Sequence, residues 1–141
     1  IIHQPVYSMF QRELAEGVVP VARRHGFGMI CFSPLAQGLL TAKYLHGIPA
    51  DSRAATPSGF LKAERIDAAT VAKIRALDAI ARGRGQSLAQ MAVAWVLRDP
   101  AVTSALIGAS RPEQIAELAK SPEAAPFSEE ELARIEAALG T

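Results

Sequence analysis

Apolar positions change their spacing several times along the chain, and each change predicts a different element. The five residues GMICF, at 28–32, carry no polar side chain, which is typical of a parallel strand that is buried on both faces. Residues 1–2 predict the end of another strand, which Pro5 closes because proline cannot donate to a central sheet. A third strand is predicted at 102–107, just before Gly108.

Longer segments between these strands show the spacing of helices with one apolar face. The predicted helices cover residues 12–25, 67–82, 87–97, 110–121 and 128–140, with a shorter one near 38–45. Three of them begin with the capping-box pattern, in which a serine is followed three residues later by glutamine or glutamate. These pairs are Ser87 with Gln90, Ser110 with Glu113, and Ser128 with Glu131.

A stretch rich in glycine, proline, serine and alanine runs from His46 to Arg65 and shows no clean period. A loop of this length inside a compact domain is usually functional. We therefore interpret it as a lid or a substrate loop.

Strands that alternate with helices predict a parallel sheet with right-handed crossovers. Three strands cannot close a barrel, and a (β/α)8 barrel typically needs about 250 residues. Two alternatives remain, a small open α/β domain or the last part of a barrel. Because the chain opens within a strand, the second is favoured. Residues 1–141 are then expected to form a single α/β fragment, the C-terminal portion of a TIM barrel with its N-terminal half absent.

Composition and charge argue against several classes of function. Half of the 141 residues are hydrophobic and 21% are charged, as in an ordinary globular domain. The net charge is +1, so neither nucleic acid nor a membrane surface is an expected partner. The longest apolar run, residues 91–97, is far below the roughly 20 residues of a membrane-spanning helix. The single cysteine, Cys31, lies in a buried run and favours a reducing, cytoplasmic compartment.

Small or polar residues follow each of the three predicted strands. Gln4 follows the first, Ser33 and Pro34 follow the second, and Gly108 and Ser110 follow the third. Ligands of parallel α/β sheets bind beyond the carboxyl ends of the strands. These residues are therefore candidates for a binding site.

The end of the third strand suits an anion. A helix N-terminus follows it, with free amides and the positive end of the helix dipole, and Arg111 adds a full charge. A phosphate site is therefore predicted near Ser110. The alternative, that Ser110 only caps its helix and Gly108 only relieves a turn, remains open.

Several other side chains allow two interpretations each. Lys43 and Arg53 could bind a pyrophosphate or sugar phosphate as paired cations, or they could be solvated surface charges. Phe32 could stack on a flat ring or belong to the core. Gln4 could bind an amide edge or satisfy its own loop. The three histidines show neither a partner nucleophile nor metal-ligand spacing, so no acid–base or metal site is predicted.

Two motifs, FSPLAQGLLTAKYLHGIPADSR at 32–53 and IGASRPEQIAE at 107–117, resemble the C-terminal half of aldo-keto reductases. The similarity also covers QPVYSMFQRE at 4–13 and RGQSLAQMAVAWVL at 84–97. It is closest to the branch that holds bacterial L-glyceraldehyde 3-phosphate reductase and the potassium-channel β-subunits. The family consists of (β/α)8 barrels that bind NADPH, so the resemblance implies that this chain supplies strands six to eight and the closing helices.

The resemblance also implies a role for individual residues along an extended NADPH molecule. Phe32 matches the aromatic residue that stacks on the nicotinamide, and Gln4 matches the glutamine that bonds its carboxamide. The remaining implied contacts are Ser33, Pro34, Leu35, Ala36 and Gln37 along the pyrophosphate and nicotinamide ribose, Lys43 and Arg53 along the phosphate path, Gly108, Ser110 and Gln114 at the 2′-phosphate and adenine, and Glu117 at the adenosine end.

Two departures from the family pattern concern the adenosine end, where many relatives have lysine in place of Gly108 and asparagine in place of Leu118. The family's catalytic tetrad lies in the N-terminal half, so no residue here is assigned a catalytic role. The resemblance implies an NADPH-dependent reductase of an aldehyde or small sugar-phosphate carbonyl, with a small-molecule substrate, and it leaves a homo-oligomer open. The alternative is a cofactor-binding, redox-sensing regulatory subunit like the channel β-subunits.

Overall fold

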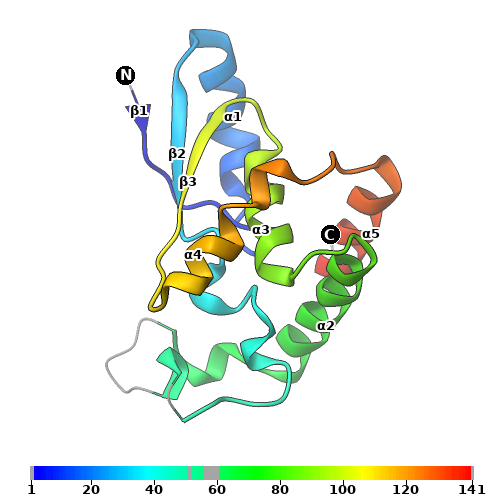
Figure 1. Ribbon diagram of the computed structural model, residues 1–141. Helices are drawn as coiled ribbons and strands as arrows, with labels where there is room; N and C mark the ends of the chain where they lie inside the picture. The colour runs from blue at the N-terminus through cyan, green and yellow to red at the C-terminus, as the bar shows by residue number, and fades with distance from the viewer. Residues whose placement is uncertain (1, 51, 56–60, 141) are drawn as a thin grey trace.

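A three-stranded parallel sheet forms one side of the described chain, and the helices lie to the other side of it (Figure 1). This computed structural model describes residues 2–50, 52–55 and 61–140, and for Ala15, Glu16 and Arg53 it describes the backbone alone. The α-helices are α1 (Glu13–His25), α2 (Ala68–Gly83), α3 (Leu88–Leu97), α4 (Pro112–Leu118) and α5 (Glu129–Leu139). The short 3-10 helices are η1 (Ala36–Gly38), η2 (Ala42–Tyr44), η3 (Arg53–Ala55), η4 (Ala63–Arg65) and η5 (Ser121–Glu123).

The strands are β1 (Ile2–His3), β2 (Gly28–Phe32) and β3 (Val102–Leu106), and they pair in the order β1-β2-β3. Ile2 lies opposite Gly28, and Phe32 lies opposite Leu106. All pairs are parallel, as the alternation of strands and helices predicts. The three carboxyl ends therefore point the same way.

Helix starts that depend on local sequence agree with the predictions in two of three cases. Ser87 accepts from the Gln90 amide at 3.1 Å and opens α3, and Ser128 opens α5 in the same way with Glu131. The box predicted for Ser110 and Glu113 is wrong. Helix α4 starts one residue later because Pro112 occupies its first position. The side chain that accepts from the amide of the cap residue, Arg111, is therefore that of Gln114 and not that of Glu113.

The helix predicted near residues 38–45 is replaced by the two short turns η1 and η2. Thr41 is extended between them, with φ −135° and ψ 167°. Its hydroxyl donates to the Gly38 carbonyl at 2.7 Å and accepts from the Lys43 amide at 3.2 Å. A side chain that takes these backbone groups competes with a continuous helix.

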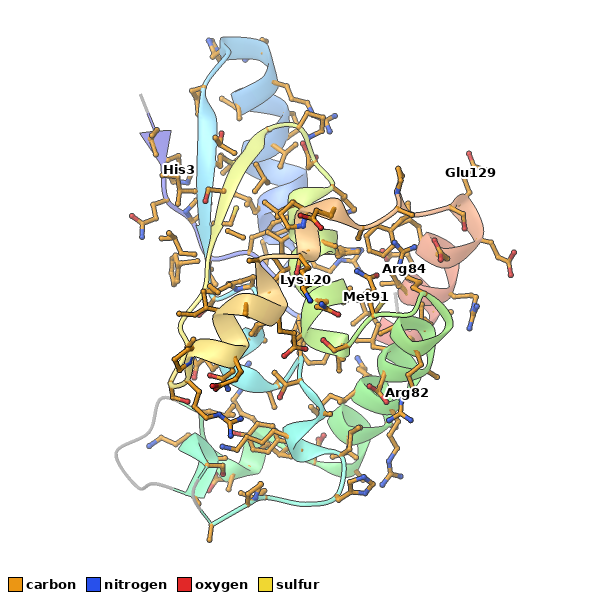
Figure 2. All side chains as sticks on the ribbon, in the orientation of Figure 1. His3, Arg82, Arg84, Met91, Lys120 and Glu129 are labelled. Carbon is orange, nitrogen blue, oxygen red and sulfur yellow. The ribbon has the colours of Figure 1, made fainter. Side chains whose placement is uncertain are left out.

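Helix α3 lies at the centre of the core, as its almost wholly apolar sequence predicts. Figure 2 shows Met91 of α3 in the middle of the molecule, where it is fully buried. Trp95 is also fully buried, with its ring centroid 5.3 Å from that of Tyr7 and 3.6 Å from the guanidinium carbon of Arg98. The helices α2 and α4 and the strand β3 surround α3 and contact it.

The prediction that β2 is buried on both faces is wrong for the described chain. Met29 and Cys31 are buried on the face toward the helices, whereas Phe32 is 41% exposed at the end of the other face. Leu106, its partner on β3, is 44% exposed. The helices cover one face of the sheet, and an apolar run alone does not reveal how many faces are covered.

Cys31 is expected to resist alkylation while the protein is folded. Burial raises the pKa of its thiol from the usual 9.0 to about 11, with a smaller contribution from the Asp99 carboxylate. Only the thiolate reacts readily. Iodoacetamide at pH 8, followed by peptide mapping, should therefore label Cys31 slowly in the native protein and fully in urea. The unfolded thiol ionises first, so the same shift lowers folding stability as the pH rises from 9 towards 11. Equal labelling rates in the two states would contradict this.

A second expected effect arises where β2 and β3 pair. The register shifts between Met29 and Ile30, and this leaves Thr103 as an extra residue in β3. A Cβ atom on Gly28 would lie 2.2 Å from the Thr103 Oγ1. Gly28→Ala is therefore expected to reduce the free energy of unfolding by about 1–3 kcal/mol, as overpacking does.

Urea unfolding of the single and double variants tests the cause. Removing the hydroxyl with Thr103→Ala leaves the Cβ of residue 103 as the nearest atom, at 3.4 Å. The double variant should recover most of the lost stability. A double variant no more stable than Gly28→Ala would show that the contact is not the cause.

Candidate binding site at the carboxyl ends of the strands

The carboxyl ends of all three strands meet at one rim of the sheet. The Phe32 amide donates to the Pro5 carbonyl at 3.0 Å, and the Tyr7 amide donates to the Phe32 carbonyl at 3.2 Å. These bonds hold the segment after Gln4 beside the end of β2. On the other side of β2, Leu106 pairs with Phe32 and leads into the residues before α4. In Figure 1 the chain leaves β2 and β3 at the same, lower end.

Phe32 lies at this rim on the uncovered face of the sheet, with 41% of its surface exposed. This side chain is therefore not enclosed by the residues that the structure describes. Gln4 is also exposed. An accessible aromatic face can receive a flat ring, and an exposed amide on the same rim can bind hydrogen-bonding groups that the ring carries.

The turn that follows β2 has an unusual backbone. Ser33, Ala36 and Gln37 have φ values of 57°, 47° and 60°, although none of them is glycine. A left-handed conformation costs about 1–2 kcal/mol for each such residue. Hydrogen bonds from the Gly38 and Leu40 amides to the Leu35 carbonyl, at 2.9 and 3.1 Å, hold the turn in shape. Strain of this kind is typical of ligand-binding segments.

The same turn contains a buried acceptor without a partner. The Gln37 Oε1 is shielded from solvent, and no hydrogen bond to it is present among the described residues. A buried polar atom in this state is unusual and indicates a group that completes its hydrogen bonding. As an acceptor, Oε1 suits a hydroxyl or N–H donor rather than a phosphate oxygen.

Donors gather at the end of β3. The Gln114 Oε1 accepts from the Ser110 amide at 2.9 Å, the Ser110 hydroxyl at 3.3 Å and the Arg111 amide at 3.3 Å. Ser110 and Arg111 are exposed. Three donors that converge on one oxygen show that this position suits an acceptor atom. Ser110 does not cap α4, since Arg111 occupies the cap position.

Glu117 lies one turn after Gln114 on α4 and is half-buried. Its Oε1 accepts from the Ser87 hydroxyl at 2.5 Å, and its backbone carbonyl accepts from the Gln90 Nε2 at 3.0 Å. Ser87 and Gln90 belong to the start of α3. Sequence reasoning identified them only as a capping box, because no local signal links them to a residue thirty positions away.

The prediction that Lys43 and Arg53 act as paired cations lies partly outside the described residues. Lys43 is an exposed residue of η2, and Arg53 lies in η3 with its side chain outside the described part. The described parts of the segment from His46 to Arg65, which is predicted to be a lid or substrate loop, lie at the lower end of the view in Figure 1, below the ends of β2 and β3. Asp51 and residues 56–60 of this segment lie outside the described residues.

Two hollows in the described chain lie away from the strand-end rim. One, of about 370 Å³, is lined by residues that include Arg84 and Lys120, both labelled in Figure 2. The other, of about 350 Å³, lies beside Gly28 and Ala101, where β2 and β3 begin. Within residues 2–50, 52–55 and 61–140, no helix is long and apolar enough to span a membrane.

Known proteins resemble this chain in sequence and in fold. The model of the Aldo/keto reductase family matches residues 1–139. The L-glyceraldehyde 3-phosphate reductase of Escherichia coli O157:H7 is 44% identical over 140 residues, which cover 96% of this chain and 40% of that protein. A probable voltage-gated potassium channel subunit beta of Oryza sativa subsp. japonica is 40% identical over 131 residues, which cover 90% of this chain and 40% of that protein.

A solved structure shows the same fold. The glycerol dehydrogenase of Gluconobacter oxydans superposes with a TM-score of 0.80 and 25% identity, over 99% of this chain and 42% of that one. The chain thus spans about two fifths of the length of the relatives that it matches. Its three parallel strands and their helices form part of a (β/α) barrel, as predicted. With a family match that extends over residues 1–139, the chain belongs to the aldo/keto reductase family.

Proposed function

We propose that the protein containing this chain is an NADPH-dependent reductase of small carbonyl compounds, either aldehydes or sugar phosphates. The observation that carries the proposal is that three strand ends with different chemistry meet at one rim. Gln4 follows β1, the exposed Phe32 ring and a strained turn with an acceptor that has no partner among the described residues lie at the end of β2, and a group of convergent donors follows β3. Membership of the aldo/keto reductase family supports it.

The chemistry of the rim fits the parts of a dinucleotide. Phe32 offers a flat apolar face for the nicotinamide, and Gln4 offers an amide for its carboxamide. The turn from Ser33 through Pro34, Leu35 and Ala36 to Gln37 lies next along the rim. The Gln37 Oε1 suits a ribose hydroxyl there, because the hydroxyl can donate the hydrogen bond that this oxygen can accept.

The adenosine end is assigned to the start of α4. Gly108 leaves room beside the donors of Ser110 and Arg111, which suit the oxygens of a 2′-phosphate. Gln114 and Glu117 follow on one face of the helix. Lys43 and Arg53 are assigned to the phosphates between the two ends, as cations. The preference for NADP over NAD would depend on Ser110, Gln114 and Arg111, because no lysine stands at position 108.

Bound NADPH would supply the hydride that reduces the carbonyl carbon. The residues of this chain would bind and orient the cofactor, with Phe32 and Gln4 fixing the face that the nicotinamide presents. We assign no proton donor to this chain. The proton for the carbonyl oxygen would come from a residue elsewhere in the full-length protein, and the substrate contacts would be shared with that part.

Steady-state assays of the full-length protein test the proposal. NADPH absorbance should fall when glyceraldehyde 3-phosphate or a panel of simple aldehydes is added. Phe32→Ala should reduce this rate, since the nicotinamide would lose its stacking surface. No rate above background with any carbonyl compound would remove the enzyme assignment.

A second candidate function follows from the similarity to the channel subunit of rice. A redox-sensing regulatory subunit would bind the same cofactor and act through a partner protein. Tight retention of NADPH with negligible turnover, together with a stable homo-oligomer in light scattering, would favour this alternative. We also expect a cytoplasmic location, because Cys31 is a buried free thiol.

A further inference from the structure

The hydroxyl of Ser87 is engaged on both of its sides. It accepts from the Gln90 amide at 3.1 Å, which caps α3. It also donates to the Glu117 Oε1 at 2.5 Å. A serine hydroxyl has a single proton, so this donation commits it to Glu117. One side chain thus joins the start of α3 to the middle of α4.

Gln90 strengthens the same connection. Its Oε1 accepts from the Ser87 amide at 3.0 Å, and its Nε2 donates to the Glu117 carbonyl at 3.0 Å. Glu117 is therefore held through its side chain and through its backbone. Helix α4 has only seven residues, which is too short for a helix to be stable by itself in water. Its position depends on contacts of this kind.

The two oxygens of the Glu117 carboxylate differ in their surroundings. Oε1 is occupied by Ser87, and among the described residues no partner is seen for Oε2. The carboxylate is half-buried and lies three residues after Gln114, on the same face of α4. Because an ionised carboxylate only accepts hydrogen bonds, Oε2 suits a hydroxyl or an amino group and not a phosphate.

We propose that Ser87 is a positioning residue for the adenosine end of the cofactor. The inference rests on the proposed function, in which Glu117 helps to hold the adenosine. By occupying Oε1, Ser87 fixes the carboxylate and leaves Oε2 for a ribose hydroxyl or the adenine amino group. A side chain that is fixed before binding loses less conformational freedom when the ligand arrives.

The test uses the full-length protein and two fragments of the cofactor. Isothermal titration with 2′,5′-ADP reports the adenosine end, and titration with nicotinamide mononucleotide reports the other end. Ser87→Ala is expected to raise the Kd for 2′,5′-ADP about tenfold, which corresponds to one hydrogen bond to a charged group. It should leave the Kd for nicotinamide mononucleotide unchanged. Ser87→Thr keeps the hydroxyl and should behave like the wild type.

Ser128→Ala provides a matched control. Ser128 caps α5 with the same pair of hydrogen bonds to Glu131, at 3.1 and 2.8 Å. No contact between its side chain and α4 is seen in the described part of the chain. Both alanine variants should lower the melting temperature because both lose a helix cap, and Ser87→Ala should lower it further because it also loses the bond to Glu117. Only Ser87→Ala should weaken the binding of 2′,5′-ADP.

The outcomes separate this inference from the function on which it rests. If the wild-type protein binds 2′,5′-ADP and Ser87→Ala binds it equally well, Ser87 does not position the site. Equal weakening by Ser87→Ala and Ser128→Ala, or equal weakening of both cofactor fragments, would show a purely structural role and also overturn the inference. A wild-type protein that binds neither fragment would overturn the proposed function and the inference together.

Discussion

The Ser110→Glu variant of the full-length protein is expected to bind NADPH about a hundredfold more weakly than the wild type, with little change for NADH. The Ser110 amide and hydroxyl lie 2.9 and 3.3 Å from the Gln114 Oε1, where an acceptor oxygen is already accommodated. A carboxylate at this position would face the 2′-phosphate that distinguishes the two cofactors. Two like charges about 4 Å apart near a protein surface repel by up to roughly 4 kcal/mol.

Titration of the two cofactors, followed by fluorescence or calorimetry, measures this effect. Glutamine has nearly the size of glutamate but carries no charge, so Ser110→Gln should reduce NADPH affinity much less than Ser110→Glu does. The difference between the two variants should shrink as salt is added, because the position is exposed. Equal weakening of NADPH and NADH by Ser110→Glu would place the phosphate elsewhere.

Arg84→Ala is expected to lower the free energy of unfolding by about 2 kcal/mol, because it removes one partner of a partly buried ion pair and several hydrogen bonds. The Arg84 side chain is 6% exposed and donates to the Gln86 Oε1 at 2.8 Å, to the Ala125 carbonyl at 2.6 Å and to the Glu131 carboxylate. Its guanidinium carbon also lies 4.0 Å from the centre of the Phe127 ring. Alanine would remove all of these contacts, and the Glu131 carboxylate would keep only its hydrogen bond from the Ser128 amide.

Arg82 is the matched control for this prediction. Its side chain is 73% exposed and pairs with Asp78 at 2.8 Å on the same helix. Figure 2 shows Arg82 toward the edge of the molecule and Arg84 nearer its centre. Arg82→Ala should cost about 1 kcal/mol or less, as for other exposed pairs. Urea unfolding that gave both variants the same loss would show that burial of Arg84 is not what matters.

Features of the fold that depend on neighbouring residues could be predicted from the sequence. The capping boxes of Ser87 and Ser128 have the predicted form, and Gly26 ends α1 with a φ of 67°. Each of these involves groups at most a few residues apart. The start of α4 was predicted one residue early because both Glu113 and Gln114 fit the box, and only the position of Pro112 decides between them.

Features that depend on distant parts of the chain could not be predicted in the same way. The run at 28–32 looks buried on all sides, yet Phe32 is exposed because the helices cover one face of the sheet. Parallel pairing does bring the three predicted strand ends together. The contact between Ser87 and Glu117 joins residues thirty positions apart, and no periodic pattern contains it.

The left-handed turn at residues 33–38 has a consequence for how quickly a ligand can be captured. Hydrogen bonds within the chain, from the Gly38 and Leu40 amides to the Leu35 carbonyl, hold its unfavourable backbone angles, so the energy needed to shape this segment is part of the folding of the chain. A ligand that docks there would meet a preformed surface and would not wait for a loop to rearrange. Association at this turn would then be limited by collision and orientation, and differences in affinity among ligands would appear mainly in how slowly they leave.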